Sequence, residues 1–258
     1  MNALAQYIVS WLKEYARTSH MEGWVVGVSG GIDSAVTSTL CAETGLPTWV
    51  VEMPIHQHPD QVSRAQTHMQ SLERRFDNVS RARVDLTEVY DRLVAALPEA
   101  EDASGGLALA NSRARLRMTT LYALAAQRRA LVAGTGNKVE DFGVGFYTKY
   151  GDGGVDISPI ADLVKTEVFA LGAVLGVGQE ILDAPPTDGL WGDDRTDKDQ
   201  LGASYPELEW AMANTDSDPS GWTERQREVM VLYTRLNRAN QHKMNPIPVC
   251  QIPEHLRA

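Results

Sequence analysis

The sequence predicts an α/β fold in which helices cover both faces of a parallel β-sheet. Short apolar runs alternate with segments of helical periodicity through the first half of the chain. The first run passes through a serine–glycine–glycine turn directly into a helix, and helical patterns without intervening strands return after residue 204. Alternating strands and helices are typical of parallel sheets whose connections pack on both faces. The late helices are expected to be C-terminal additions to this fold.

Periodicity assigns the elements of the N-terminal half. Residues 3–16 place Leu4, Ile8, Trp11, Leu12 and Tyr15 at helical spacing, which predicts an amphipathic helix. The apolar runs that follow are short enough to be buried strands. We therefore expect strands at residues 24–28, 47–53, 79–84 and 130–133, and helices from residue 32 and at residues 59–76, 86–97 and 107–129.

The C-terminal half is predicted to be less regular. Helices are expected at residues 164–175, 205–212 and 223–240, followed by an extended tail at residues 245–258 that is broken by prolines. Two segments without apolar periodicity, residues 98–106 and 185–200, are expected to be loops. The second is long for a simple connection, and we expect it to close as a lid over bound ligands.

Length and composition limit the number of domains that the chain can form. The chain has 258 residues, of which 43% are hydrophobic and 22% charged, as in ordinary globular proteins. At about 150 residues per domain, this length allows one large domain or two small ones. Because no internal repeat and no linker divides the chain, we expect a single domain over residues 1–258.

Charge and cysteine content argue against several classes of protein. A net charge of −10 disfavours a nucleic-acid partner, because phosphate backbones are bound by basic surfaces. No apolar run approaches the length of about 20 residues that spans a membrane, and the N-terminus lacks the pattern of a signal peptide. Two cysteines, Cys41 and Cys250, are too few for a disulfide framework, which favours a cytoplasmic location.

The segment V-V-G-V-S-G-G-I-D-S-A-V at residues 25–36 is the most informative in the chain. Its glycines let the backbone turn tightly, and the helix that follows presents unpaired N–H groups, so a pyrophosphate would be well held. The hydroxyls of Ser29 and Ser34 add donors. Asp33 would repel that anion unless a divalent cation joins the two, which predicts Mg²⁺. The alternative interpretation is an ordinary glycine turn with a helix cap.

Two common nucleotide motifs do not fit this segment. A Walker A loop needs G-x-x-x-x-G-K-[ST], and a dinucleotide fingerprint needs G-x-G-x-x-G. The pattern S-G-G-x-D-S between a strand and a helix instead resembles the PP-loop ATP pyrophosphatase superfamily. The resemblance implies a Rossmann-like fold of the adenine nucleotide alpha hydrolase-like type. It also implies cleavage of ATP between the α- and β-phosphates, with the adenylate activating a carboxylate or a carbonyl.

Later motifs resemble the NAD synthetase family within that superfamily. They occur in the family's order over nearly the whole chain: N-S-R-A-R-L-R-M at 111–118, G-T-G-N-K-V-E at 134–140, F-Y-T-K-Y-G-D-G-G-V-D at 146–156, Pro159, Lys165, Pro186-Thr187 and Gln241-His242-Lys243. Each motif alone is weak, and together they are highly specific. The resemblance implies a ligase that amidates deamido-NAD (nicotinic acid adenine dinucleotide) with ammonia through an adenylated intermediate, giving NAD, AMP and pyrophosphate.

The resemblance also implies roles for individual residues. Asp33, Lys165 and Asp152 would be catalytic, Asp152 by capturing ammonium, and Asp33 and Glu140 would be Mg²⁺ ligands. ATP would be bound by Gly27, Val28, Ser29, Gly30, Gly31, Ile32, Asp33, Ser34, Thr135, Lys165 and Thr187. Deamido-NAD would be bound by Arg115, Lys149, Asp156, His242 and Lys243. Because the family binds the dinucleotide between subunits, a homodimer is expected.

Several of these residues have a structural alternative. Arg113 and Arg117 are four residues apart on one helix face, and Arg115 points roughly the opposite way. They cannot all face one ligand, so two of the three are expected to be solvated or structural. Turn chemistry or surface position would equally explain Thr135, Asp152 and His242.

Two features depart from the family pattern. The G-T-G-N-K-V-E motif is closer to glutamine-dependent members than to the G-T-D-H-A-A-E of short bacterial ones. Yet 258 residues leave no room for a glutaminase domain, so ammonia is the expected donor, free or supplied by a separate glutaminase. Glu52 stands where the family often has a basic residue near adenine, and no adenine contact is assigned.

Two other functions compete with this interpretation. The first is a different PP-loop enzyme, such as an RNA-modifying one, which the acidic charge and the two cysteines disfavour. The second is a non-enzymatic ATP-binding module of the universal-stress type. Such a module would not need Lys149, Lys165 and Glu140 in the family's order.

Overall fold

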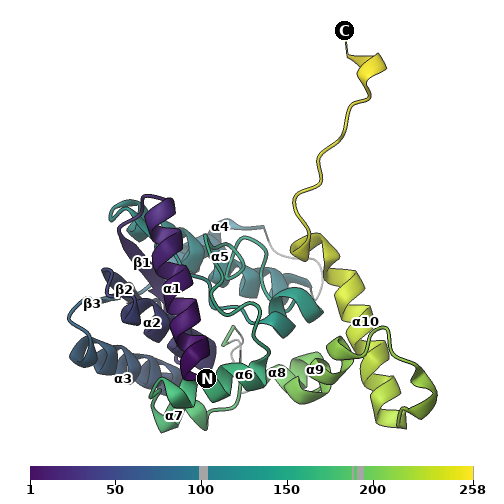
Figure 1. Ribbon diagram of the computed structural model, residues 1–258. Coiled ribbons are helices and arrows are strands. Elements are labelled where there is room, and N and C mark those ends of the chain that lie inside the picture. The colour runs from purple at the N-terminus through teal and green to yellow at the C-terminus, as the bar shows by residue number, and fades with distance from the viewer. Residues whose placement is uncertain (99–103, 188, 191–194, 258) are drawn as a thin grey trace.

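A parallel β-sheet forms the centre of the computed structural model, which describes residues 1–98, 104–187, 189–190 and 195–257 (Figure 1). Its strands are β1 (Gly23–Gly27), β2 (Thr48–Glu52), β3 (Val79–Arg83) and β4 (Ala130–Val132), in the order β3-β2-β1-β4. Val25 is in register with Trp49 of β2 and Val132 of β4, so β1 is paired on both sides. The predicted parallel sheet is confirmed.

Helices cover both faces of this sheet, as the sequence predicts. Trp24 and Val26 of β1 pack in one buried cluster with α1, α2 and α6, whereas Val25 packs in another with α4 and α5. Among the described residues, no helix has both the length and the apolar character needed to cross a membrane. The helices are α1 (Asn2–Thr18), α2 (Ile32–Glu43), α3 (Pro59–Arg75), α4 (Thr87–Ala96), α5 (Ser104–Ala126), the π-helix η1 (Val139–Val144), α6 (Lys165–Val174), α7 (Gln179–Leu182), α8 (Asp197–Leu201), α9 (Tyr205–Ala213), the 3₁₀ helix η2 (Pro219–Gly221), α10 (Glu224–Met244) and the 3₁₀ helix η3 (Glu254–Leu256).

The strand order creates a crevice at the carboxyl ends of β1 and β4. The chain leaves β1 toward β2 and β3, and only later returns to the other side of β1 to form β4. Open α/β sheets bind ligands where the strand order reverses in this way. The serine–glycine turn follows β1, and residues 134–136 follow β4, so both border this crevice.

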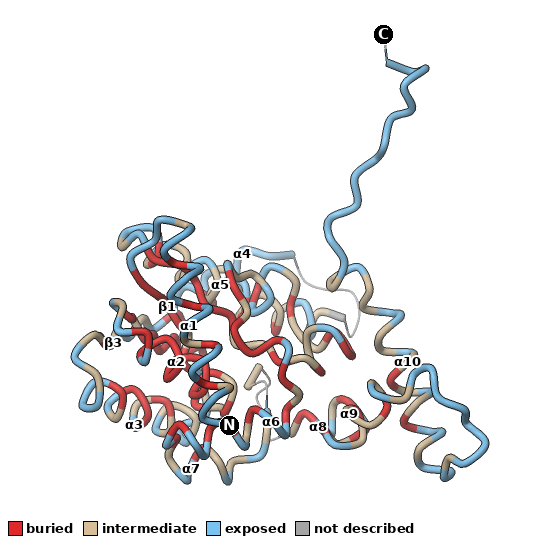
Figure 2. Tube along the Cα trace, in the orientation of Figure 1, coloured by how far each residue is buried: buried red, intermediate tan, exposed pale blue. Residues whose placement is uncertain are grey.

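The C-terminal helices form a separate buried cluster beside the sheet. Val139 and Val144 of η1 pack there against Leu208 of α9 and against Val229 and Tyr233 of α10. Beyond α10, residues 245–257 run away from the rest of the molecule (Figure 1) and are exposed along their whole length (Figure 2). These helices are the C-terminal additions expected from the sequence, and the tail is extended as expected except at the 3₁₀ helix η3.

The structure corrects three expected boundaries. α10 continues to Met244, because Pro246 is the first residue that cannot extend it, so residues 241–243 are helical. Thr196 and Asp199 form a capping box that starts α8 inside the segment expected to be a loop. Helix α5 begins at Ser104, so residues 104–106 are helical. Residues 99–103, 188 and 191–194 lie outside the described residues, and the lid stays a prediction.

A buried histidine joins α2 to α3. His68 is 3% exposed, and its Nε2 lies 2.9 Å from Oγ of Ser38. The Ser38 hydroxyl donates to the carbonyl of Ser34 at 2.7 Å, so we assign the hydrogen of this contact to Nε2 of His68. Burial, and then Arg75, lower the pKa of His68 to about 4. The imidazole is therefore neutral in the folded protein at neutral pH.

This histidine should make the folded state sensitive to acid. The unfolded chain binds a proton at His68 near pH 6.5, whereas the folded chain does so only near pH 4, so stability is complete above pH 6.5 and falls as the pH drops between these values. We expect the free energy of unfolding to fall by about 2 kcal/mol from this group between pH 7 and pH 5. Urea unfolding at both pH values measures it. In His68→Gln, which keeps an N–H donor but does not titrate, the loss should be about 2 kcal/mol smaller; equal losses in both proteins would contradict the assignment.

Candidate active site

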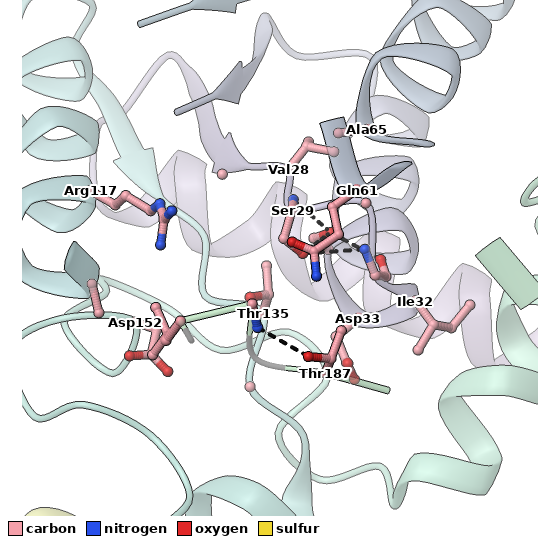
Figure 3. Close-up of a pocket in the computed structure, with 18 of the residues that line it drawn as sticks. Val28, Ser29, Ile32, Asp33, Gln61, Ala65, Arg117, Thr135, Asp152 and Thr187 are labelled. Atoms are coloured by element: carbon pink, nitrogen blue, oxygen red, sulfur yellow. Dashed lines mark hydrogen bonds between the residues drawn. The ribbon is translucent and has the colours of Figure 1, made fainter. Parts of the chain in front are cut away.

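A cavity opens at the crevice between β1 and β4 (Figure 3). Residues 27–34 line one side of it, and in Figure 3 Arg117 and Asp152 lie away from Ser29 and Asp33, toward the other side. All eleven residues expected to bind ATP line this cavity: Gly27, Val28, Ser29, Gly30, Gly31, Ile32, Asp33, Ser34, Thr135, Lys165 and Thr187. The tertiary structure therefore brings together segments that are far apart in the sequence.

The turn after β1 is held in shape by its own hydroxyls. The backbone N–H of Ser29 donates to Oγ of Ser34 at 3.2 Å, and that hydroxyl donates to the carbonyl of Gly31 at 3.0 Å. Gly30 adopts a φ of 85°, in the left-handed region. Gly31 precedes α2 without a side-chain cap, so the first N–H groups of α2 remain available to an anion.

An ion cluster lies beside this turn. Nζ of Lys165, the first residue of α6, is 2.6 Å from Oδ2 of Asp33 and 2.9 Å from Oε1 of Glu140. The lysine side chain is 4% exposed and each carboxylate 16%. Nζ also lies 4.6 Å from the ring centre of Tyr205, whose hydroxyl contacts the same Oε1 of Glu140. The ammonium is thus enclosed by two anions and an aromatic face.

The pKa values of the cluster follow from burial and pairing. Burial alone would lower the pKa of Lys165, but Asp33 and Glu140 outweigh it, and the net pKa is raised. Burial raises the pKa of Asp33, and Lys165 opposes this. Burial and then the carboxylate of Glu140 raise the pKa of Tyr205, which keeps the phenol protonated. The lysine is therefore a permanent cation in this site.

Asn137 contacts both the carboxylate of Asp33 and the backbone of Glu140. Its Nδ2 donates to Oδ1 of Asp33 at 3.1 Å, and its Oδ1 accepts the N–H groups of Val139 and Glu140 at 3.1 and 3.2 Å. The residue is fully buried. Sequence reasoning assigned it no role, although it lies inside the G-T-G-N-K-V-E motif. The sequence signal that could have identified it is its position just before a helix, where asparagine often accepts the first N–H groups.

Two further carboxyl groups line the same cavity. Asp152 accepts the N–H of Thr148 at 2.9 Å, and burial raises its pKa to about 6. Burial, and then Glu140 and Asp152, raise the pKa of Asp141 to about 8. Its carboxyl group packs on Gly136, where any Cβ would lie 2.2 Å from the Asp141 oxygen. Asp141 was not singled out in the sequence, because only the fold turns it toward this cavity.

The three neighbouring arginines differ in environment. Arg117 is turned inward, where Nε donates to the carbonyl of Met53 at 3.0 Å and burial lowers its pKa to about 10. Arg113 lies over the ring of Tyr90 at 4.9 Å. Arg115, which the family resemblance singled out, is outside the cavity and contacts the carbonyl of Lys149 at 3.3 Å. Arg115 thus points away from the side of the helix that carries Arg113 and Arg117, as the helical spacing predicts.

The residues expected to bind the dinucleotide do not line this cavity. Four of them gather where α5, α10 and residues 145–150 meet. Nζ of Lys149 lies 2.5 Å from the carbonyl of His242, and Nζ of Lys243 lies 2.8 Å from that of Tyr147. The fifth, Asp156, accepts the N–H of Val132 at 2.8 Å at the edge of the sheet. In this structure Lys149, Lys243 and Asp156 are therefore engaged by backbone groups.

Glu52 and Thr187 lie at two other edges of the cavity. Glu52, at the end of β2, is buried and accepts from Nε2 of Gln66 at 3.2 Å. Thr187 donates to the carbonyl of Arg195 at 3.2 Å. The carboxylate at the end of β2 thus has partners within the protein, a hydrogen bond from an amide and an ion pair with Arg83 at 3.6 Å.

Comparison with known proteins identifies relatives over almost the whole chain. The family model described as NAD synthase matches residues 4–246. The chain is 37% identical to the NH(3)-dependent NAD(+) synthetase of Carboxydothermus hydrogenoformans over 238 residues, which covers 92% of each protein. It is 35% identical to the NH(3)-dependent NAD(+) synthetase of Syntrophomonas wolfei, over 99% of this chain and 98% of the relative. The solved NMN synthetase from Francisella tularensis superposes with a TM-score of 0.83 at 30% identity, covering 98% of both chains.

The conformation of the turn after β1 can be tested with adjacent glycines. Gly30→Ala should lower the free energy of unfolding by about 1–3 kcal/mol, because φ is 85° and the new Cβ would lie 2.5 Å from the carbonyl oxygen of Gln61. Gly31→Ala is the matched control, since its Cβ would meet only Oγ of Ser29 at 3.4 Å. Denaturant unfolding without ligand measures both, and equal stability of the two variants would contradict this geometry.

Proposed function

Because this chain belongs to the NAD synthase family, we propose that it is a C–N bond-forming ligase that amidates deamido-NAD with ammonia, using ATP. The substrate carboxylate attacks the α-phosphate of ATP, and pyrophosphate leaves. Ammonia then attacks the adenylated carbonyl, and AMP leaves as NAD forms. The observation that carries this proposal is the placement of Lys165, Asp33 and Glu140 beside the turn after β1, inside one cavity with Asp152.

The turn after β1 supplies the phosphate site. Its hydroxyl-braced backbone and the uncapped start of α2 would hold the β- and γ-phosphates of ATP. Thr135 and Thr187 border the same space. Lys165 would stabilise the charge that gathers on the departing pyrophosphate. The protein's main contribution is to hold two anionic substrates in line while cations screen their repulsion.

Asp33 and Glu140 fit a divalent cation. Their oxygens already converge on one cation in this structure, the ammonium of Lys165, and carboxylate oxygens are the ligands that Mg²⁺ prefers. Within the described residues, no third acidic or histidine side chain joins them as a ligand group. ATP oxygens and water would therefore complete the coordination, as is usual for Mg²⁺. Bound there, Mg²⁺ would neutralise phosphate charge and orient the α-phosphate for attack.

Asp152 would bind and deprotonate ammonium. A carboxyl group with a pKa of about 6 is largely ionised at neutral pH, so it would attract ammonium into the cavity. Transfer of one proton from ammonium to that carboxylate leaves neutral ammonia, the form that can attack the carbonyl. Asp141, with a pKa of about 8, stays largely protonated and does not add a further negative charge beside Asp33, Glu140 and Asp152.

A homodimer would complete the dinucleotide site. The face of α1 exposes Trp11 and Tyr15, whose rings contact each other at 5.7 Å, and half-exposed Phe142 lies beside the same hollow. Exposed aromatic groups of this kind are typical of interfaces. Asp156, one of the residues expected to bind deamido-NAD, borders this hollow, which supports binding between subunits. Arg115, Lys149, His242 and Lys243 would bind the rest of that substrate.

Amidation of a mononucleotide is a second candidate for the activity. The solved relative with a TM-score of 0.83 is named NMN synthetase, and its sequence is 30% identical to this chain. Both reactions need the same adenylation of a nicotinic acid carboxylate. They differ only in whether a second nucleotide is attached to the substrate. A direct comparison of the two substrates decides between them.

Nitrogen donor, domain content and location complete the proposal. We assign ammonia as the donor and one synthetase domain to residues 1–258, in keeping with the NH(3)-dependent relatives that match over most of their length. A separate glutaminase would be the source where free ammonia is scarce. Cys41 and Cys250 are both unpaired, which supports a cytoplasmic location.

Product analysis tests the proposed activity. The purified chain is incubated with ATP, Mg²⁺, ammonium and either deamido-NAD or nicotinic acid mononucleotide. We expect NAD, AMP and pyrophosphate in equal amounts with the dinucleotide, because the phosphate site favours cleavage between the α- and β-phosphates. Faster turnover of the mononucleotide would instead support the second candidate. Release of ADP and phosphate would refute the superfamily mechanism, and efficient use of glutamine in place of ammonium would refute the assigned donor.

Conservative variants test the metal ligands. Asp33→Asn and Glu140→Gln should each lower Mg²⁺-dependent turnover roughly 10²–10³-fold, the typical effect of losing one charged interaction at a transition state. Circular dichroism checks that both variants fold. Glu73→Gln is the control, since its carboxylate is exposed and pairs with Arg81 on the surface. Wild-type turnover in either active-site variant would exclude that residue as a ligand.

A further inference from the structure

Lys165 occupies the position that a metal ion would take. A cation bound by Oδ2 of Asp33 and Oε1 of Glu140 must lie between these two oxygens, at about 2.1 Å from each if it is Mg²⁺. Nζ of Lys165 already lies between them, at 2.6 and 2.9 Å. An ammonium and a metal ion cannot share that space, so the two cations are mutually exclusive.

Most of the hydrogen-bonding capacity of this ammonium is used where it lies. It has three N–H donors, of which two are directed to Asp33 and Glu140, and the ring of Tyr205 lies 4.6 Å from Nζ. The side chain is 4% exposed. In this arrangement it has little capacity left for a phosphate, although it lines the same cavity as the turn after β1. Contact with ATP therefore requires Lys165 to leave the two carboxylates.

Charge balance explains why the lysine stays there without ligands. Asp33 and Glu140 are both largely buried, and two buried carboxylates without a cation between them would strongly destabilise the fold. A metal ion that arrives alone must displace a buried ammonium and leave it without an anionic partner. A metal ion that arrives with ATP brings phosphate oxygens for that ammonium, which its flexible four-carbon stem allows it to reach.

We propose that Lys165 is an internal substitute for the metal ion, which keeps the site between Asp33 and Glu140 closed until a polyphosphate draws the lysine away. Metal binding thereby depends on nucleotide binding. Lys165 accordingly has two positions, one between the carboxylates without ligands and one on the phosphates during the reaction. This inference rests on the metal and phosphate sites of the proposed function.

Metal binding without nucleotide tests this role. Mn²⁺ is titrated as a probe into the wild-type chain and into Lys165→Met, and the free ion is followed by electron paramagnetic resonance. Methionine keeps the unbranched stem and removes the charge. We expect Mn²⁺ to bind at least tenfold more tightly to Lys165→Met than to the wild type. Equal or weaker binding by the variant would overturn the proposal.

Two further variants locate the effect. Lys138→Met is the matched control, because Lys138 pairs with the exposed Asp162 at 2.8 Å, and its removal should leave Mn²⁺ affinity unchanged. Adding Glu140→Gln to Lys165→Met should abolish the gain, because it removes one of the two oxygens. Persistence of the gain in the double variant would place the bound ion elsewhere and overturn the proposal.

Thermal unfolding gives an independent measurement. Without metal, Lys165→Met should melt below the wild type, and millimolar Mg²⁺ should raise its midpoint while leaving the wild type unchanged. If Lys165→Met is unfolded without metal, Mg²⁺ must restore its native circular dichroism, and failure to do so would overturn the proposal. None of these measurements uses a substrate, so they remain readable if the ligase assay fails. A wrong role for Lys165 would in turn leave the amidation proposal standing.

Discussion

The site depends on one lysine ammonium held between two buried carboxylates. Asp33 comes from the first turn of α2, Glu140 from η1 and Lys165 from the start of α6. Because their charges are largely removed from water, none of the three is stable there without the others. Their mutual pairing therefore fixes how α2, η1 and α6 meet at the crevice of the sheet. The hydroxyl of Tyr205 then links this ion cluster to the C-terminal helices.

The strand order explains why these segments meet. α2 directly follows β1, whereas η1 and α6 come after β4, which lies on the other side of β1. A backbone contact between the N–H of Lys138 and the carbonyl of Leu163, at 2.8 Å, ties the start of η1 to the segment before α6. Residues separated by more than a hundred positions thus face one cavity. A ligand bound there touches both halves of the fold.

The negative charge of the cavity is limited by protonation of one carboxyl group and offset by two cationic side chains. Asp141 stays largely protonated at neutral pH, since burial and neighbouring carboxylates raise its pKa to about 8. Asp152 ionises near pH 6, which leaves it charged and able to attract a cation. Arg117 and Lys165 supply the positive charge that anionic substrates require. An acidic protein can in this way hold positive charge inside one cavity without a basic surface.

The sequence by itself determined the order of strands and helices and the turn after β1. Those features follow from local causes, namely apolar periodicity, glycine conformation and helix capping, which neighbouring residues set. The family resemblance named the eleven residues expected to bind ATP, and the fold brings all of them to one cavity. Periodicity placed Arg113 and Arg117 opposite Arg115, but only packing of α5 on the sheet showed that Arg117 is the one that lines the cavity.

Tertiary structure alone decided which distant groups touch. It placed Asn137 behind Asp33, turned Asp141 into the cavity and set Lys165 between Asp33 and Glu140. It also extended α10 through His242 and Lys243, whereas the sequence predicts that this helix ends at residue 240. Contacts of this kind depend on burial and on the electrostatic pairing of charges from separate elements. No sequence pattern predicts these contacts, because burial and charge pairing arise only when the folded sheet brings the separate segments to one crevice.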